Sequence, residues 1–283
     1  AQSAALVNVV EGRYVVTKTG FFLERDELTR VNMDFVADVC YAALAHLGTS
    51  LREGRPAGLG VLGPVWKSTV YEDLSKLPEP ARTSWFAFDH FYSDSAFPAA
   101  LEILSHEDIG HLADVGANTG RFATAFLERN PAARVTLVDL GPQLALAEAN
   151  LGQAGLAARA AFHPCDVTAT EITFPRGVDA FWMSQFLCCF SEEQIVAILA
   201  RALESLPAGG SVYVLDTFWD KQKFDIAAYC LINTSPYFTA VANGNSRMYK
   251  AIDLVAMAGR AGLRLVRSYE DLGWSHTLLK LSR

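Results

Sequence analysis

Glycines and acidic residues follow the ends of two expected strands at a spacing suited to a ribose-containing ligand. The segment from Leu112 reads Leu-Ala-Asp-Val-Gly-Ala-Asn-Thr-Gly and lies where an apolar strand should pass into a helix. Gly116 and Gly120 permit a tight turn and close approach of a ligand to the backbone. The helix expected from Arg121 would offer free N–H groups there. The next strand ends at Asp139, 19 residues after Gly120, a spacing at which a carboxylate binds ribose hydroxyls. The plainer alternative is a glycine turn without a ligand.

These residues need a parallel sheet to bring the strand ends together. Seven apolar segments read as strands, and helical patterns lie between most of them. The segments are His111–Val115, Arg134–Asp139, Ala160–His163, Val178–Ser184, Ser211–Thr217, Leu263–Tyr269 and Thr277–Ser282. This alternation predicts an α/β fold with helices on both faces of the sheet. Ser191 and Gln194 form a capping-box pattern that begins one of the helices.

The first part of the chain has a different pattern. A hairpin-like stretch is expected over Ala5–Leu23, a helix over Val31–Leu51, a loop over Gly54–Gly63, and one or two aromatic-rich helices over Trp85–Leu104. We therefore predict two regions, residues 1–107 and residues 108–283. Because the chain does not begin with Met, we expect further residues before Ala1.

Composition excludes several classes of protein. Of the 283 residues, 51% are hydrophobic and 19% charged, which excludes a disordered chain. No apolar run reaches the roughly 18 residues that a membrane span needs. The net charge of −7 argues against a duplex nucleic-acid partner. Five cysteines without paired CxxC spacing indicate neither a metal site nor disulfides, and favour reduced thiols in the cytoplasm.

The pattern Asp114-x-Gly116-x-Asn118-x-Gly120 resembles the first motif of class I S-adenosylmethionine (SAM)-dependent methyltransferases, with Asn118 at the place of a middle glycine. Asn tolerates a positive φ better than most residues, so the turn can form. A carboxylate at Asp114 would repel a pyrophosphate but suits the ammonium group of SAM. The resemblance implies a Rossmann-like class I methyltransferase fold, a seven-stranded and mostly parallel sheet, that binds SAM and releases S-adenosylhomocysteine (SAH).

The resemblance also implies which side chains contact the cofactor. Asp139 would hold the ribose hydroxyls, and Asp166 would accept from the adenine amino group, although a turn cap is the alternative for Asp166. Tyr92 falls where the family often has a Met near the sulfonium, and its electron-rich ring would favour that cation; core packing is the alternative. The expected set is Tyr92, Asp114, Gly116, Asn118, Gly120, Asp139, Leu140, Asp166, Val167, Ser184 and Gln185.

Over its whole length the chain is similar to small-molecule O-methyltransferases with an N-terminal winged-helix-like dimerisation domain. Gly12–Gly20 resembles the wing, and Phe88–Asp94 resembles the helix that crosses over the cofactor. This likeness implies a homodimer. The aromatic stretch Phe218–Tyr249 has few charges and is expected to cover a flat aromatic or apolar acceptor, or else to form the dimer interface.

The family pattern fails at the expected base. These enzymes typically have a base His in a segment that here reads Leu-Cys-Cys-Phe-Ser-Glu-Glu, which puts Cys188 at the base position. A thiol of ordinary pKa is a poor base, although a positive environment could make it a thiolate; packing is the alternative. If a histidine serves instead, His90 is the first candidate and His276 the second.

These observations favour a cytoplasmic, homodimeric, SAM-dependent methyltransferase of secondary metabolism. Its acceptor would be a small aromatic or polyketide-like metabolite, methylated at oxygen. Methylation at carbon or nitrogen stays open, as does a SAM-binding enzyme with a non-methylating reaction such as a rearrangement or decarboxylation. A regulatory or scaffold protein that binds through the winged-helix-like part is a third possibility, against which the acidic charge argues.

Overall fold

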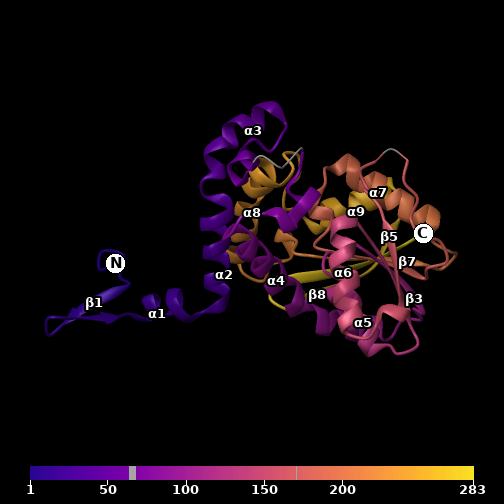
Figure 1. The fold of residues 1–283 in the computed structure, drawn as a ribbon, viewed down its shortest axis with the longest axis horizontal. Coiled ribbons are helices and arrows are strands. Elements are labelled where there is room, and N and C mark those ends of the chain that lie inside the picture. Colours follow the sequence, from indigo (N-terminus) through magenta and orange to yellow (C-terminus); the bar gives the residue numbers. More distant parts are fainter. Residues whose placement is uncertain (64–67, 170) are drawn as a thin grey trace.

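The computed structural model describes residues 1–63, 68–169 and 171–283, and its centre is a seven-stranded sheet (Figure 1). The strands are β3 (His111–Val115), β4 (Arg134–Asp139), β5 (Ala160–Pro164), β6 (Ala180–Ser184), β7 (Ser211–Asp216), β8 (Arg264–Leu272) and β9 (His276–Ser282), in the order β5-β4-β3-β6-β7-β9-β8. The first five strands in this order are parallel, and β9 is antiparallel to both neighbours. The expected strands are confirmed to within three residues at each end.

Alternate side chains along the strands build two cores, one on each face of the sheet. The covering helices are α4 (Ala81–Leu104), α5 (Arg121–Arg129) and α6 (Gly141–Gln153) on one face, and α7 (Glu192–Ser205) and α9 (Ala251–Arg260) on the other. Leu112 and Trp182 belong to the first core, whereas their neighbours Ala113 and Met183 belong to the second. The sheet is therefore buried on both faces, as its continuous apolar strands require.

The chain order reverses at β3. The next strand along the chain, β4, pairs on one side of β3, while β6 pairs on the other. Crossovers before and after such a strand leave on opposite faces of the sheet, which opens a crevice at the carboxyl ends of the strands. This topology puts Asp114, Asp139 and Ser184 at one edge of the sheet.

The N-terminal part begins with an arm that projects from the body of the molecule (Figure 1). The hairpin is confirmed as β1 (Val7–Val10) and β2 (Arg13–Val16), with Val7 opposite Val16. It is shorter than expected because the Thr17 side chain accepts from the Gly20 N–H and starts helix α1 (Lys18–Arg25). The expected helix over residues 31–51 is interrupted: α2 (Glu27–Phe35) and α3 (Leu47–Glu53) are separated by a π turn and a 3-10 turn.

A third core joins the two parts of the chain. Helix α8 (Asp225–Tyr237) and the π turn after it, Phe238–Ala242, pack against residues 35–85. The segment expected to be a loop contributes a short 3-10 helix, Ala57–Leu62, to this core. The buried apolar side chains described for residues 1–107 therefore belong to cores shared with the rest of the chain, and helix α4 contributes to both the first and the third core. Among the described residues, no helix is long and apolar enough to cross a membrane.

The capping box at the start of α7 is present and gives a test of local stability. The Gln194 N–H donates to Ser191 Oγ, and the Ser191 N–H donates to Gln194 Oε1 at 2.9 Å. We expect Ser191→Ala to lower the free energy of unfolding by about 1 kcal/mol because an amide of the first turn loses its acceptor. Urea unfolding monitored by circular dichroism measures the change. Ser205→Ala at the other end of α7 is the control, and an equal loss there would contradict the capping role.

Candidate active site

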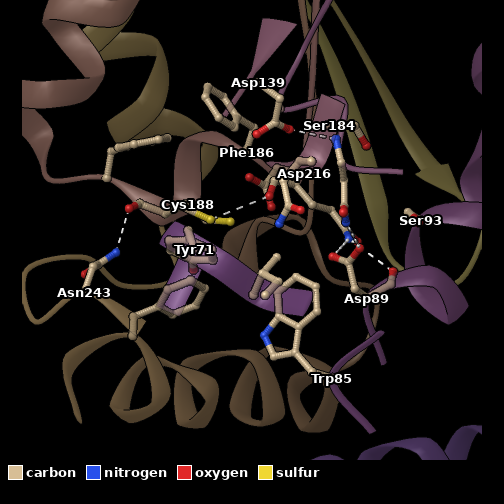
Figure 2. A pocket seen from close by; sticks show the side chains of 18 of the residues that line it. Tyr71, Trp85, Asp89, Ser93, Asp139, Ser184, Phe186, Cys188, Asp216 and Asn243 are labelled. Carbon is tan, nitrogen blue, oxygen red and sulfur yellow. Dashed lines mark hydrogen bonds between the residues drawn. The ribbon is translucent and has the colours of Figure 1, made fainter. Parts of the chain in front are cut away.

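A cavity of about 550 Å³ lies at the carboxyl ends of β3, β4, β6 and β7. Figure 2 shows strand-end side chains on one side of it, with Trp85 of α4 on the other. Of the expected cofactor residues, all except Gly120 line this cavity, and so do His90 and Cys188. His276 and Gly120 are not among the described residues that line it.

The turn after β3 has the backbone that its glycines imply. The φ values of Gly116, Asn118 and Gly120 are 74°, 48° and 77°, so Asn118 adopts the left-handed conformation expected of a glycine replacement. Gly120 serves packing: a Cβ there would lie 2.7 Å from Leu151 Cδ1 on α6. The turn therefore holds the start of α5 close to β4, with its backbone facing the cavity.

Asp139 is held by this turn. Its Oδ2 accepts from the Asn118 N–H and its Oδ1 from the Leu140 N–H, both at 2.7 Å. Burial raises the pKa of Asp139, although these two hydrogen bonds oppose the shift. Each oxygen retains a lone pair, so the oriented carboxylate can accept two hydroxyl groups.

Asp114 is a buried carboxyl group with an unused oxygen. It is 3% exposed, and its Oδ2 has no hydrogen-bond partner among the described residues. Burial, and secondarily the charge of Asp139, raises its pKa to about 8. A carboxylate in this position is stabilised by a cation placed against it.

The remaining cofactor residues divide into two groups. Asp166 caps a turn, because its Oδ1 accepts from the Thr168 N–H at 2.9 Å and from Thr168 Oγ1 at 2.6 Å. This is the alternative interpretation of Asp166, but the side chain lines the cavity too. Ser184 Oγ is buried without a partner among the described residues, and Leu140 and Val167 supply apolar walls.

A chain of hydrogen bonds connects Gln185 to helix α4. The Gln185 Nε2 donates to Asp89 Oδ1 at 3.2 Å, and Asn118 Nδ2 donates to Asp89 Oδ2 at 3.3 Å. Gln185 Oε1 lies 2.8 Å from His276 Nε2. Gln185 has a φ of 48°. This backbone conformation is uncommon for a residue other than glycine, and the hydrogen bonds of the Gln185 side chain stabilise it. Burial raises the pKa of Asp89 to about 6.

The two histidine candidates differ in their access to the cavity. His276 is 0% exposed, lies outside the cavity wall and is held by Gln185; burial lowers its pKa to about 3. His90 lines the cavity at its cofactor end, 3.4 Å from Arg121 Nη1 and 3.5 Å from Thr119 Oγ1. Burial, then the Arg121 charge, lowers its pKa to about 4. Burial thus weakens both imidazoles as bases, and the assignment of a histidine as the base stays a prediction.

Cys188 is buried at the other end of the cavity, on a 3-10 turn of residues 187–189. Its hydrogen bond with Cys189 and its burial raise the thiol pKa well above the ordinary value, and the Asp216 charge adds to this. Figure 2 shows Cys188 beside Asp216, and the two side chains interact. The positive environment that a thiolate base needs is therefore not found, and Cys188 acts as a hydrogen-bond donor.

Aromatic rings surround this end of the cavity. Phe35 of α2 and Phe88 of α4 are stacked with ring centroids 4.1 Å apart, and Trp85 Nε1 donates to Tyr237 Oη at 2.8 Å. Tyr92 lines the cavity too, and its hydroxyl accepts from Asn32 Nδ2 at 2.9 Å. Such walls fit a flat apolar or aromatic molecule.

Asp216 was missed in the sequence analysis. It ends β7 as Asp139 ends β4, is 4% exposed, and lines the cavity. The same signal, an apolar strand that ends in Asp, could have identified it. Among the described residues, no group of three or more His, Cys, Asp or Glu side chains could hold a metal ion.

A family profile described as an O-methyltransferase domain matches residues 93–264, more than half of the chain. The chain belongs to the O-methyltransferase domain family. The expected family and the Rossmann-like methyltransferase fold are thereby confirmed. The match includes β3 to β7 and the cavity residues that follow them.

Individual relatives agree with this membership. L-tyrosine C(3)-methyltransferase of Streptomyces lavendulae is 25% identical over 220 residues, 77% of this chain and 59% of that protein. Aclacinomycin 10-hydroxylase RdmB of Streptomyces purpurascens is 32% identical over 194 residues, 66% of this chain and 48% of that protein. The chain thus spans about half the length of the curated relatives it matches.

The fold is also similar to solved structures. The apo crystal structure of the S-adenosylmethionine-dependent methyltransferase SibL aligns with a TM-score of 0.72 and 25% identity, covering 100% of this chain and 82% of that chain. The alignment includes the N-terminal part of this chain, which the family profile does not match.

The raised pKa of Asp114 predicts a pH dependence of stability. Below about pH 8, folded Asp114 retains a proton that the unfolded chain has released, so the free energy of unfolding should fall as the pH rises from about 7 to 8 and should level off above that. His90 and His276 add little there, because both are neutral in the folded and unfolded states. Asp114→Asn should reduce the fall, whereas Asp108→Asn at an exposed position should not. Urea unfolding at several pH values measures the free energy of unfolding. An identical pH dependence in wild type and Asp114→Asn would contradict the raised pKa of Asp114.

Proposed function

We propose that this protein binds SAM in the cavity and transfers its methyl group to a small acceptor. The observation that carries the proposal is the buried Asp114 carboxyl group, with an unpartnered oxygen beside a glycine turn and next to Asp139. Among the described residues that line the cavity, Arg121 is the only Lys or Arg. The carboxyl groups of that lining are Glu72, Asp89, Asp114, Asp139, Asp166 and Asp216. This charge suits a cationic ligand such as SAM.

The residues present fit the parts of SAM. Asp114 would face its ammonium group, and Asp139 would accept from the two ribose hydroxyls. Asp166 has an oxygen beyond its turn cap for the adenine amino group, and Tyr92 offers its ring to the sulfonium. When bound, SAM supplies a methyl group on a good leaving group, so the protein's contribution is alignment and exclusion of water.

The acceptor proposed is a small aromatic or polyketide-like metabolite, methylated at oxygen. The aromatic walls formed by Phe35, Phe88 and Trp85 support a flat acceptor, and the family description supports oxygen as the methylated atom. Two relatives are named for L-tyrosine and aclacinomycin. A metabolite of this kind belongs to secondary metabolism. We infer a cytoplasmic protein from its five free cysteines.

A second candidate is a SAM-binding enzyme that does not methylate. One relative, 32% identical, is named a hydroxylase, and neither His90 nor His276 is placed as a base. Mass spectrometry of reactions with SAM and a panel of catechols, hydroxybenzoates and hydroxynaphthoates distinguishes the two. A product heavier by one methyl group supports the first candidate. A product changed without that gain supports the second.

The cofactor assignment predicts the effect of Asp139→Ala. We expect SAH to bind this variant at least about tenfold more weakly, because charge-assisted hydrogen bonds are lost. Isothermal titration calorimetry measures the affinity, and thermal unfolding shows that the variant is folded. Glu148→Ala, at an exposed position on the following helix, should bind SAH normally. Unchanged affinity in Asp139→Ala would exclude a ribose contact.

We further propose that residues 1–107 form a dimerisation region and that the projecting arm packs against a second copy. The arm exposes large apolar side chains to a degree that is unusual for a monomer. They are Val9, Val10, Tyr14, Val15, Val16, Phe21 and Phe22, each at least 46% exposed. A second copy would bury them about a two-fold axis, the common arrangement of homodimers.

Sedimentation equilibrium tests the dimer. We expect the mass of two chains for the full protein and of one chain for Phe21→Asp/Phe22→Asp, because charge would be buried at the interface. The control is Glu24→Gln, an exposed neighbour on the same helix. A monomeric wild-type protein would refute the proposal without affecting the cofactor assignment.

A further inference from the structure

One carboxyl group of the cavity has no role in the proposed function. It lies at the end lined by Cys188 and Trp85, which we call the acceptor end. Asp216, the last residue of β7, is 4% exposed and lines the cavity. Figure 2 shows it between Cys188 and the region of Asp89, on the side of the cavity opposite Trp85. It is therefore distant along the sheet from the Asp114 and Asp139 pair, because β3 and β6 separate β7 from β4.

The partners of Asp216 are neutral. The Thr217 N–H donates to its Oδ1 at 2.8 Å, and the backbone N–H and the thiol of Cys188 interact with the carboxylate as neutral donors that lower its pKa. These donors fix the orientation of the carboxylate without the charge of a cation, so burial raises its pKa to about 6. A buried carboxylate without a cation beside it is harder to ionise than an exposed one, so it takes up a proton at a higher pH.

The titratable groups behind it cannot take its place. The Cys188 thiol faces Asp216 and is held in the protonated form, and Cys189 and Tyr71 pack behind Cys188. The pKa of Tyr71 is raised well above its ordinary value, first by burial and then by the charge of Cys189. Unlike the Cys188 thiol and the Tyr71 hydroxyl group, Asp216 is thus a buried group of the described cavity lining that can accept a proton near neutral pH.

We propose that Asp216 is the catalytic base that accepts the proton of the acceptor's hydroxyl group, with Cys188 as its positioning residue. This inference rests on the proposed methyl transfer. The acceptor O–H bond breaks and its proton passes to a carboxylate oxygen of Asp216, while the oxygen lone pair forms a bond to the methyl carbon of SAM. The carbon–sulfur bond breaks and its electron pair stays on sulfur, which gives neutral SAH. The proton leaves Asp216 to solvent after product release.

The mechanism identifies the class of acceptor. A neutral hydroxyl group on an aromatic ring can donate to Asp216, whereas a carboxylate placed against it would meet a like charge in a buried site. Phenols of low acidity should depend on the base most, because phenols that are already ionised need none. The dependence of rate on acceptor acidity is therefore the measurement that separates a base from a structural group.

The first experiment compares wild type with Asp216→Asn on para-substituted phenols from 4-methoxyphenol to 4-nitrophenol. We expect kcat/KM to fall by about 100-fold or more for the least acidic phenol and by less than about tenfold for 4-nitrophenol. Asp225→Asn, an exposed residue on the following helix, should match wild type throughout. An equal loss for all phenols, or no loss, overturns the proposal.

The second experiment does not depend on turnover. 4-Nitrophenol is added to the complex with SAH at a pH at which the free probe is the yellow phenolate. In wild type, two anions would meet, so we expect about one proton to be taken up and the yellow absorbance to be lost on binding. In Asp216→Asn the bound probe should stay yellow. No binding to wild type, or the same colour in both proteins, overturns the proposal.

Calorimetry with SAH separates the two levels of inference. Wild type and Asp216→Asn should bind SAH with equal affinity, because Asp216 is at the acceptor end. Failure of wild type to bind SAH would refute the proposed function itself. Suppose instead that wild type binds SAH and transfers methyl groups normally, but that the loss in Asp216→Asn is the same for acidic and weakly acidic phenols. That result would refute only the assignment of the base.

The positioning role of Cys188 has its own test. Cys188→Ser, which retains a donor, should keep more activity than Cys188→Ala.

Discussion

The cost of burying carboxyl groups at neighbouring strand ends constrains the rest of the cavity. Asp114 and Asp139 lie near the ends of paired strands, where burial opposes the ionisation of both and the charge of Asp139 opposes that of Asp114 further. Among the described residues, none donates a hydrogen bond to Oδ2 of Asp114. Such an arrangement is stable as a neutral acid, or as an anion with a cation against it. The charge of the site therefore favours a positively charged ligand, whatever the shape of the cavity.

Backbone conformation makes that arrangement possible. The left-handed turn from Gly116 to Gly120 directs the Asn118 N–H to Asp139, which orients one carboxylate and leaves the other unpaired. Asn118 also reaches Asp89 on α4 through its side chain. A glycine could adopt the turn but could not make this second contact, since it has no side chain. The replacement of a glycine by Asn thus couples the cofactor turn to the helix that covers the cavity.

Much of the sheet and the glycine turn could be predicted from the sequence, since strand periodicity, glycine spacing and the capping box are local signals. The acceptor end could not. Its walls come from α2, α4 and α8, whose side chains meet in a core that joins residues 35–85 to residues 237–248. No local pattern encodes that contact, and so the division near residue 107 did not anticipate a shared core. The same holds for the histidines: residue type shows basicity, whereas burial and access, which depend on distant parts of the chain, decide whether it can be used.

Asp216 at the end of the neighbouring strand β7 explains why a thiol can stand at position 188, where the family typically has a base histidine. The thiol and N–H of Cys188 interact with Asp216 as neutral donors, whereas a histidine at position 188 could itself take up a proton and carry a positive charge beside the carboxylate. With those donors neutral, the negative charge stays on the strand-end carboxylate and its basicity is preserved by burial. The chain thus keeps a proton acceptor beside the acceptor end while changing the residue that carries it. Position 188 fixes the orientation of that carboxylate, and the rigid end of β7 fixes its place.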